Sequence, residues 1–295
     1  MPHIHRAALA SSVIAPLLIL TGLIYLRGWV RIRRVGRETI AVWRAISFLF
    51  GTVVIGTALG SPMAALDHEM LTAHMVQHLL LMTLAPAFIL LGAPWMALLQ
   101  GSPHQLVRSV VVPAFRWPPV RRLGKVLAQP AFCWIAATAI LVGWHMPALF
   151  SLGLQSEVWH LVEHTSFLAA GFLFWWPVIR PWPSAAASPR WTTILYLFLA
   201  TLPCDILSGF LVFCDRVVYP VYLSTPQHFG ISALEDQQRA GALMWTCVTL
   251  VYLLAAAIVA VRLLSVRSAE ENELMPPELP ATVAAGTGQQ SVEVA

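Results

Sequence analysis

Two pairs of histidines in this 295-residue sequence are each separated by four positions. His74 and His78 form the first pair, and His160 and His164 form the second, with Glu163 directly before His164. Residues three or four positions apart lie on the same face of a helix, with side chains about 6 Å apart. If both segments are helical, each helix presents two imidazoles on one face, and the second helix adds a carboxylate.

A fifth histidine, His145, lies in the motif Gly143-Trp-His-Met-Pro147, at the predicted end of another helix. Imidazole nitrogen suits zinc, copper, iron and nickel, whereas the thioether sulfur of methionine favours Cu(I). Met70 and Met75 lie beside the first histidine pair, and Glu163 and Asp236 could orient imidazole N–H groups. The spacing therefore predicts a transition-metal site whose ligands are His74, His78, His145, His160 and His164.

The same residues allow other interpretations. Imidazoles and a carboxylate at these positions could form a polar network that only holds helices together. His160-Leu-Val-Glu-His164 also matches the HxxEH motif of inverted zinc proteases, in which Glu163 would be the general base for a metal-bound water. The segment from Thr72 to His78 is similar to the HxxxH boxes of membrane di-iron oxygenases, which makes a redox protein a further alternative.

The composition indicates that lipid surrounds the elements that carry these residues. Hydrophobic residues make up 58% of the chain and charged residues 11%, against roughly 45–50% and about 25% in a soluble domain. The mean hydropathy is +0.72. So few charges cannot cover a water-soluble fold of this size. The net charge of +4 does not indicate a nucleic-acid partner, because a membrane protein places its basic residues by topology.

Seven stretches are long enough to cross a bilayer core, which takes about 20 apolar residues. They are 9–26, 40–59, 71–91, 131–150, 160–179, 191–214 and 240–263. We therefore predict an all-α polytopic membrane protein, a bundle of seven transmembrane helices in a single domain of residues 1–267. Residues 268–295 are too polar to bury a core and are predicted to form a disordered cytoplasmic tail.

Basic residues set the predicted orientation. Of the 18 Lys and Arg residues, all but Arg6, Arg216 and Arg239 fall on alternate connectors or the helix ends beside them. The positive-inside rule makes that side cytoplasmic, with the N-terminus outside and the C-terminus inside. Under this topology every histidine except His104 lies in the outer half of the protein. The predicted metal site is therefore extracytoplasmic.

Four segments of the sequence resemble a known family. They are HMVQHLLLMTLAPAFILLGAP from His74, WHMPALF from Trp144, HLVEHTSFLAAGFLFWWPVI from His160 and LEDQQRAGALMW from Leu234. In combination they are similar to the CtaG-type bacterial cytochrome c oxidase assembly factors, over roughly residues 40–262. Where the family has paired prolines after the first motif, this chain has Pro86 followed by Ala87.

The resemblance implies a multi-pass protein of the bacterial cytoplasmic membrane, with cytochrome c oxidase subunits and membrane lipid as partners. It implies a role in maturing a haem-copper oxidase, and it adds Gln77 and Gln237 to the supporting residues Met70, Met75, Glu163 and Asp236. We expect an assembly factor without catalytic turnover that binds or delivers copper through a His/Met site. The alternatives are a membrane metalloenzyme that uses the same histidines and a structural assembly scaffold.

Overall fold

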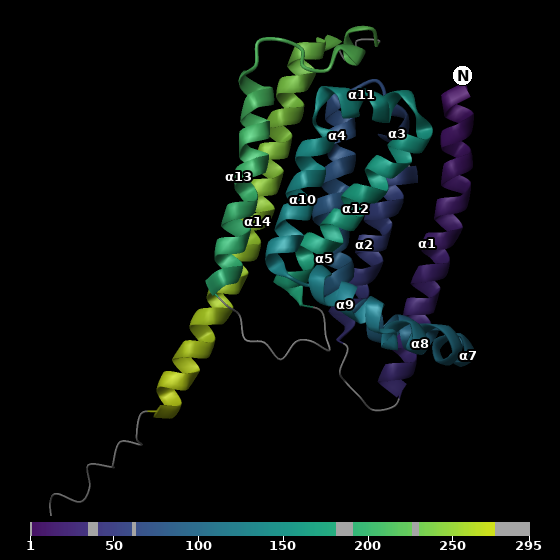
Figure 1. The fold of residues 1–295 in the computed structure, drawn as a ribbon, viewed down its shortest axis with the longest axis vertical. Helices are drawn as coiled ribbons and strands as arrows, with labels where there is room; N and C mark the ends of the chain where they lie inside the picture. Colours follow the sequence, from purple (N-terminus) through teal and green to yellow (C-terminus); the bar gives the residue numbers. More distant parts are fainter. Residues whose placement is uncertain (1, 35–40, 61–62, 181–190, 226–229, 275–295) are drawn as a thin grey trace, which may run out of the picture.

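The structure, a computed structural model, describes residues 2–34, 41–60, 63–180, 191–225 and 230–274. All regular elements in these ranges are helical (Figure 1). In chain order they are α1 (Pro2–Arg34), α2 (Val42–Gly60), α3 (Met63–Leu66), α4 (Leu71–Leu79), η1 (Leu80–Leu84), α5 (Ala85–Leu91), α6 (Pro94–Gly101), α7 (His104–Leu106), η2 (Val107–Val111), α8 (Val112–Arg116), α9 (Pro118–Leu127), α10 (Pro130–Trp144), α11 (Pro147–Gln155), α12 (Glu157–Ile179), α13 (Trp191–Phe213), η3 (Pro220–Leu223) and α14 (Ala233–Leu274).

Five helical segments are long and apolar enough to cross a membrane. They are Ile14–Arg34, Val42–Gly60, Leu71–Leu91, Trp191–Phe213 and Ala233–Ser265. A sixth is obtained if α9 and α10, which meet at a bend of 74°, form one broken span. The all-helical membrane architecture is thus supported, while the count of seven and the orientation stay predictions.

Two of the predicted spans differ from expectation for identifiable reasons. The stretch 131–150 is divided between α10 and α11, because the helix ends after Trp144 and a new one begins at Pro147. α12 has 23 residues but is not among the five segments found in the described chain. Its first turns carry Glu157, His160, Glu163 and His164, which lower its mean hydropathy.

The third predicted span is continuous but irregular. α4 passes through a π-helical turn, η1, into α5, which has Pro86 in its first turn. A proline lacks the backbone N–H and crowds the preceding turn, and a π turn is one way in which a helix accommodates this. The helix then ends at Gly92, and the left-handed Ala93, at φ 49°, leads into α6 at Pro94. The predicted third span, 71–91, therefore ends at the expected residue.

Short helices α7, α8 and α9 lie at one end of the bundle, whereas α3 and α11 lie at the other end (Figure 1). α9 starts with Pro118 and Pro119, and its charged residues Arg121, Arg122 and Lys125 are exposed. Its neighbour α8 exposes 56% of Phe115. An amphipathic segment of this kind suits the boundary between lipid tails and head groups.

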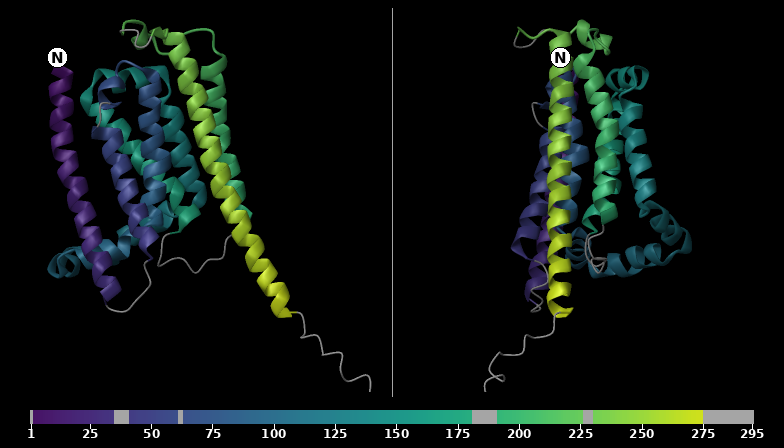
Figure 2. Two further views of the ribbon diagram at one scale, coloured as in Figure 1. Left: turned by 180° about the vertical axis from the view of Figure 1, so that it is seen from behind. Right: turned by 90° about the vertical axis from the view of Figure 1, so that its left-hand side faces the viewer.

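The last two long helices, α13 and α14, run side by side as a hairpin, and α14 projects beyond the other helices at the end that carries α9 (Figure 2). α14 also packs on α4, and α13 on α10. Residues 268–274, which we expected to belong to the tail, continue α14. The rest of the predicted tail, 275–295, lies outside the described residues.

Candidate metal centre

α4 carries the first pair of histidines into the interior of the bundle. His74 is fully buried and His78 nearly so, and their ring centroids are 4.3 Å apart, as expected for residues four positions apart on a helix. The start of α4 is fixed by a residue distant in sequence. The Asp236 carboxylate accepts hydrogen bonds from the N–H of Leu71 at 2.6 Å and of Thr72 at 3.2 Å. It therefore caps α4 from α14, at the helix end where negative charge is favourable.

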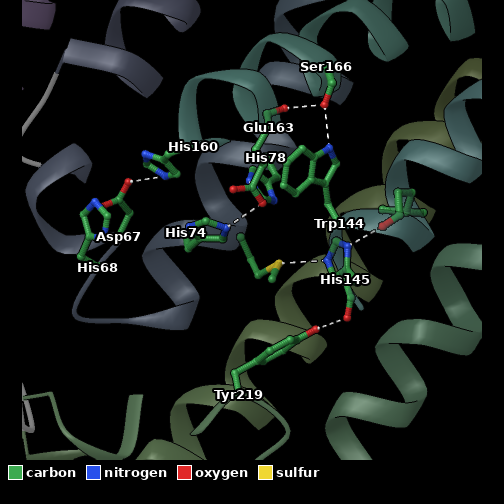
Figure 3. A network of polar contacts seen from close by, with 12 residues as sticks. Asp67, His68, His74, His78, Trp144, His145, His160, Glu163, Ser166 and Tyr219 are labelled. Carbon is green, nitrogen blue, oxygen red and sulfur yellow. Dashed lines mark hydrogen bonds and ion pairs between the residues drawn. The ribbon is translucent and has the colours of Figure 1, made fainter. Parts of the chain in front are cut away.

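α12 carries the second pair. His160 and His164 lie on one face, with ring centroids 4.2 Å apart and ring planes tilted by 59°. Glu163 is fully buried, and its Oε1 lies 3.4 Å from Nε2 of His74 and 3.4 Å from Nε2 of His78. The structure thus gathers His74, His78 and Glu163 into one group, the Glu163 triad, whose potential ligand atoms all lie within 4.8 Å of one another (Figure 3).

A second group involves a carboxylate that the sequence analysis did not single out. Asp67, in the connector before α4, is fully buried, and its Oδ2 lies 3.3 Å from Nε2 of His160. Asp67, His160 and His164 also offer ligand atoms within 4.8 Å of one another, and we call this group the Asp67 triad. Burial raises the pKa of Asp67 to about 7, against the opposing effect of hydrogen bonds from the His68 backbone and the Gln77 side chain.

The two triads form one continuous cluster. The His78 and His164 ring centroids are 5.7 Å apart, and those of His74 and His160 are 5.8 Å apart. Among the described residues, several buried polar atoms of the cluster have neither a hydrogen-bond partner nor an ion-pair contact: Nδ1 of His74, Nδ1 of His78, Nε2 of His164 and Oε2 of Glu163. Each such atom costs about 1–3 kcal/mol when left unpaired, so the cluster is suited to a ligand that satisfies several of them together.

The spacing of the donor atoms suits a metal ion. The contacts of 3.3 Å and 3.4 Å between carboxylate oxygen and imidazole nitrogen exceed the usual 2.7–2.9 Å of a charge-assisted hydrogen bond. Two ligands about 2.0–2.1 Å from a tetrahedral ion are separated by about 3.3–3.4 Å. The observed separations therefore match the edge of a coordination tetrahedron.

His145, the fifth predicted ligand, lies beside the cluster rather than within either triad. Its ring centroid is 6.3 Å from that of His78. Its Nδ1 lies 2.7 Å from the carbonyl oxygen of Leu141, and its Nε2 lies 3.3 Å from Sδ of Met75 (Figure 3). The predicted combination of histidine and methionine is therefore present, but between these two residues.

The connector between α13 and α14 supports the cluster from outside. The Tyr222 hydroxyl donates to the Asp67 carbonyl at 2.9 Å, and the Tyr219 hydroxyl donates to the His145 carbonyl at 2.9 Å. Both tyrosines are buried. They fix the backbone on both sides of the candidate site, a role that no local sequence pattern signals.

The other supporting residues have structural partners. Gln77 donates from Nε2 to the Ala58 carbonyl at 2.9 Å and so joins α4 to α2. Gln237 accepts from the Val218 N–H at 2.7 Å and holds the connector to the start of α14. Met70 is partly exposed at the residue that precedes α4.

The position of Glu163 also bears on the HxxEH alternative. In that interpretation Glu163 would serve an ion held by His160 and His164. Its carboxylate instead groups with His74 and His78 on α4, while His160 and His164 group with Asp67. The pattern is present in the sequence, but its three residues are divided between two triads.

Comparison with known proteins identifies the family. The family model described as "Cytochrome c oxidase caa3 assembly factor (Caa3_CtaG)" matches residues 23–265. The chain belongs to this family. The match covers all four motifs of the sequence resemblance, which is thereby confirmed, and it includes both triads.

Three curated mycobacterial relatives match a large part of the chain. A protein of Mycobacterium leprae is 24% identical over 254 residues, which is 81% of this chain and 37% of the relative. Proteins of Mycobacterium bovis and Mycobacterium tuberculosis are each 26% identical over 230 residues, 75% of this chain and 34% of the relative. All three are described as uncharacterized, and this chain spans about a third of their length. No solved structure matches.

Proposed function

We propose that this protein binds copper at the cluster formed by the two triads and helps to metallate or assemble a haem-copper terminal oxidase in the bacterial cytoplasmic membrane. Its role is that of a non-catalytic assembly factor whose partners are oxidase subunits and membrane lipid. The observation that carries the proposal is the pair of 3.4 Å separations between Glu163 and the imidazoles of His74 and His78. Imidazole and carboxylate together suit a first-row transition ion.

The family supports the oxidase part of this proposal, because its members are assembly factors for cytochrome c oxidase. The position of the cluster supports an extracytoplasmic role. The cluster lies toward the end of the bundle that carries α3 and α11, and α9 with its Arg and Lys residues lies toward the opposite end. By the positive-inside rule, the end with α9 faces the cytoplasm.

Two substitutions test the proposal. His78→Ala and His164→Ala each remove one donor from a different triad. Both variants should insert into the membrane as the parent does, but bind less copper and support less oxidase activity. His104→Ala is the matched control, because His104 is exposed on α7 at the opposite end of the bundle.

The measurements are elemental analysis of protein purified in mild detergent, and the copper content and activity of the oxidase in the same cells. Unchanged bound copper and full oxidase activity in both triad variants would contradict the proposal. Stoichiometric iron or zinc in place of copper would keep the metal site and reject the copper role.

A further inference from the structure

A second group of potential metal donors lines a cavity beside the cluster. The cavity has a volume of about 40 Å³ and lies between α4, η1, α10, α12, α13 and α14. Four sulfur-bearing side chains line it, from four different elements: Met75, Met82, Cys204 and Met244. All four are buried, and Cys204 is a free thiol.

Two histidines, His78 and His145, lie in the cavity wall. His145 is 4% exposed, and its Nδ1 lies 2.7 Å from the Leu141 carbonyl, which can only accept a hydrogen bond. The neutral ring therefore carries its hydrogen on Nδ1 and has its lone pair on Nε2. His78 is 5% exposed, and its Nε2 lies 3.4 Å from Oε1 of Glu163, so this ring contacts the Glu163 triad as well as lining the cavity.

The contact between His145 and Met75 is the decisive feature. Nε2 of His145 lies 3.3 Å from Sδ of Met75. A thioether sulfur has no hydrogen to donate, so in this tautomer two electron-pair donors face each other inside the protein. A cation bound by both atoms would convert this unfavourable contact into two coordination bonds.

The lining selects the kind of cation. Thioether, thiol and imidazole are neutral, soft or borderline donors, a set that favours Cu(I). Among the described residues no Asp or Glu lines the cavity, and most of its remaining wall is apolar, including Trp134, Phe167 and Phe174. A doubly charged ion is costly in such surroundings when no anionic ligand accompanies it. Each triad, by contrast, contains one carboxylate, Asp67 or Glu163, that could accompany a doubly charged ion.

We propose that this cavity is a second metal position, specific for a soft monovalent cation such as Cu(I), with His145 and Met75 as its central donors and Met82, Met244 and Cys204 in reach around it. The inference rests on the proposed function and deepens it. His78 belongs to the Glu163 triad and also lines the cavity, so the two positions share a wall. An ion could pass between them without leaving the protein.

The test loads the full-length chain, purified in detergent, with Cu(I) and records its X-ray absorption spectrum. The parent should show sulfur neighbours around copper. The double variant Met75→Leu with Met244→Leu should show fewer sulfur neighbours around copper and weaker Cu(I) binding, because leucine keeps the volume and removes two of the four sulfur donors. Met96→Leu, on α6 and outside the cavity, should behave as the parent does.

Two results would overturn the inference: Cu(I) bound in the parent with nitrogen and oxygen neighbours only, or a double variant whose sulfur signal and Cu(I) affinity both equal those of the parent. A Zn(II) binding measurement distinguishes rejection of the Cu(I) position in the cavity from rejection of the metal site at the triads. The double variant should bind Zn(II) as the parent does, whereas Glu163→Gln should lose Zn(II) and keep the sulfur signal. Undiminished Zn(II) binding by Glu163→Gln would instead contradict the assignment of the triads.

Discussion

Gly153 on α11 offers a way to displace one candidate ligand without replacing it. A Cβ atom added at this position would lie 2.7 Å from Oε2 and 3.5 Å from Cδ of Glu163, and 3.6 Å from the Trp144 ring. The closest atom belongs to the end of a flexible side chain, so Gly153→Ala should move the carboxylate rather than the backbone. Within a helix the change from glycine to alanine adds about 0.5–1 kcal/mol of stability, which opposes any general loss of folding.

The size of the displacement follows from ordinary contact distances. A carbon and an oxygen atom approach to about 3.3 Å, so the carboxylate oxygen must move by about 0.6 Å from its 2.7 Å position. Metal–ligand distances are held to about 0.2 Å. The shift exceeds this tolerance, and a change of this kind around a metal ligand typically weakens metal affinity by about 10–100-fold. The corresponding loss of binding free energy is about 1.4–2.7 kcal/mol.

The assay is a competition for Cu(II) or Zn(II) between the detergent-purified protein and a chelator of known affinity. Gly143→Ala on α10 is the matched control, since among the described residues nothing lies within 4 Å of a Cβ added there. Thermal unfolding of both variants verifies that the helices remain intact. Equal metal affinity for Gly153→Ala and the parent would refute the reasoning, because Glu163 would then not be a ligand.

Three further substitutions test the surroundings of the site. Asp236→Ala removes the cap of α4 and should lower the free energy of unfolding by about 1–2 kcal/mol, measured by denaturant titration. Asp236→Asn should retain most of this stability. Equal stability of the parent and both variants would contradict the capping role. Tyr222→Phe removes the hydrogen bond to the Asp67 carbonyl and should lower the free energy of unfolding by about 1–3 kcal/mol, visible as a lower Tm and weaker metal binding. An unchanged Tm would argue against a supporting role for this hydrogen bond. Gly28→Ala places a Cβ against the Ala97 carbonyl where α1 meets α6, so it should reduce the yield of folded protein. A normal yield and an unchanged Tm would show that α1 can move away from α6 without loss of stability.

The sequence predicted best the features that depend on local spacing. His74 and His78, and likewise His160 and His164, stand four residues apart, so their common faces follow from helix geometry alone. The structure brings these four residues into the two triads. The family resemblance was also readable from the motifs, and the family model confirms it.

The features that were missed depend on contacts between distant segments. Asp67 lies in a short irregular connector, where there is no helical spacing of apolar residues from which the inward direction of its side chain could be predicted. Asp236 was expected to orient imidazoles, but its carboxylate bonds are to the start of α4, 165 and 164 positions away in sequence. Glu163 was predicted to share a helix face with His160 and His164, but the imidazoles nearest its carboxylate belong to His74 and His78 on α4.

The number of spans was difficult to predict because polar residues concentrate at the site. The turns of α12 that carry His160, Glu163 and His164 depress the hydropathy of that helix, so composition alone does not rank it with the five apolar segments. α10 is also short, with 15 residues, because it ends at Trp144 and His145 is the residue that follows its last turn. Pro147 starts a new helix just where the fifth histidine enters the site.

The hydrogen bonds donated by Tyr219 and Tyr222 and accepted by Asp236 have a consequence for the order in which the chain is made. These three residues come from the last third of the sequence, yet they secure the backbone around His145 and Asp67 and the start of α4. During synthesis from the N-terminus, the histidines emerge from the ribosome well before their supports. The backbone around both triads therefore gains these hydrogen bonds only after the residues of the α13–α14 hairpin have been made.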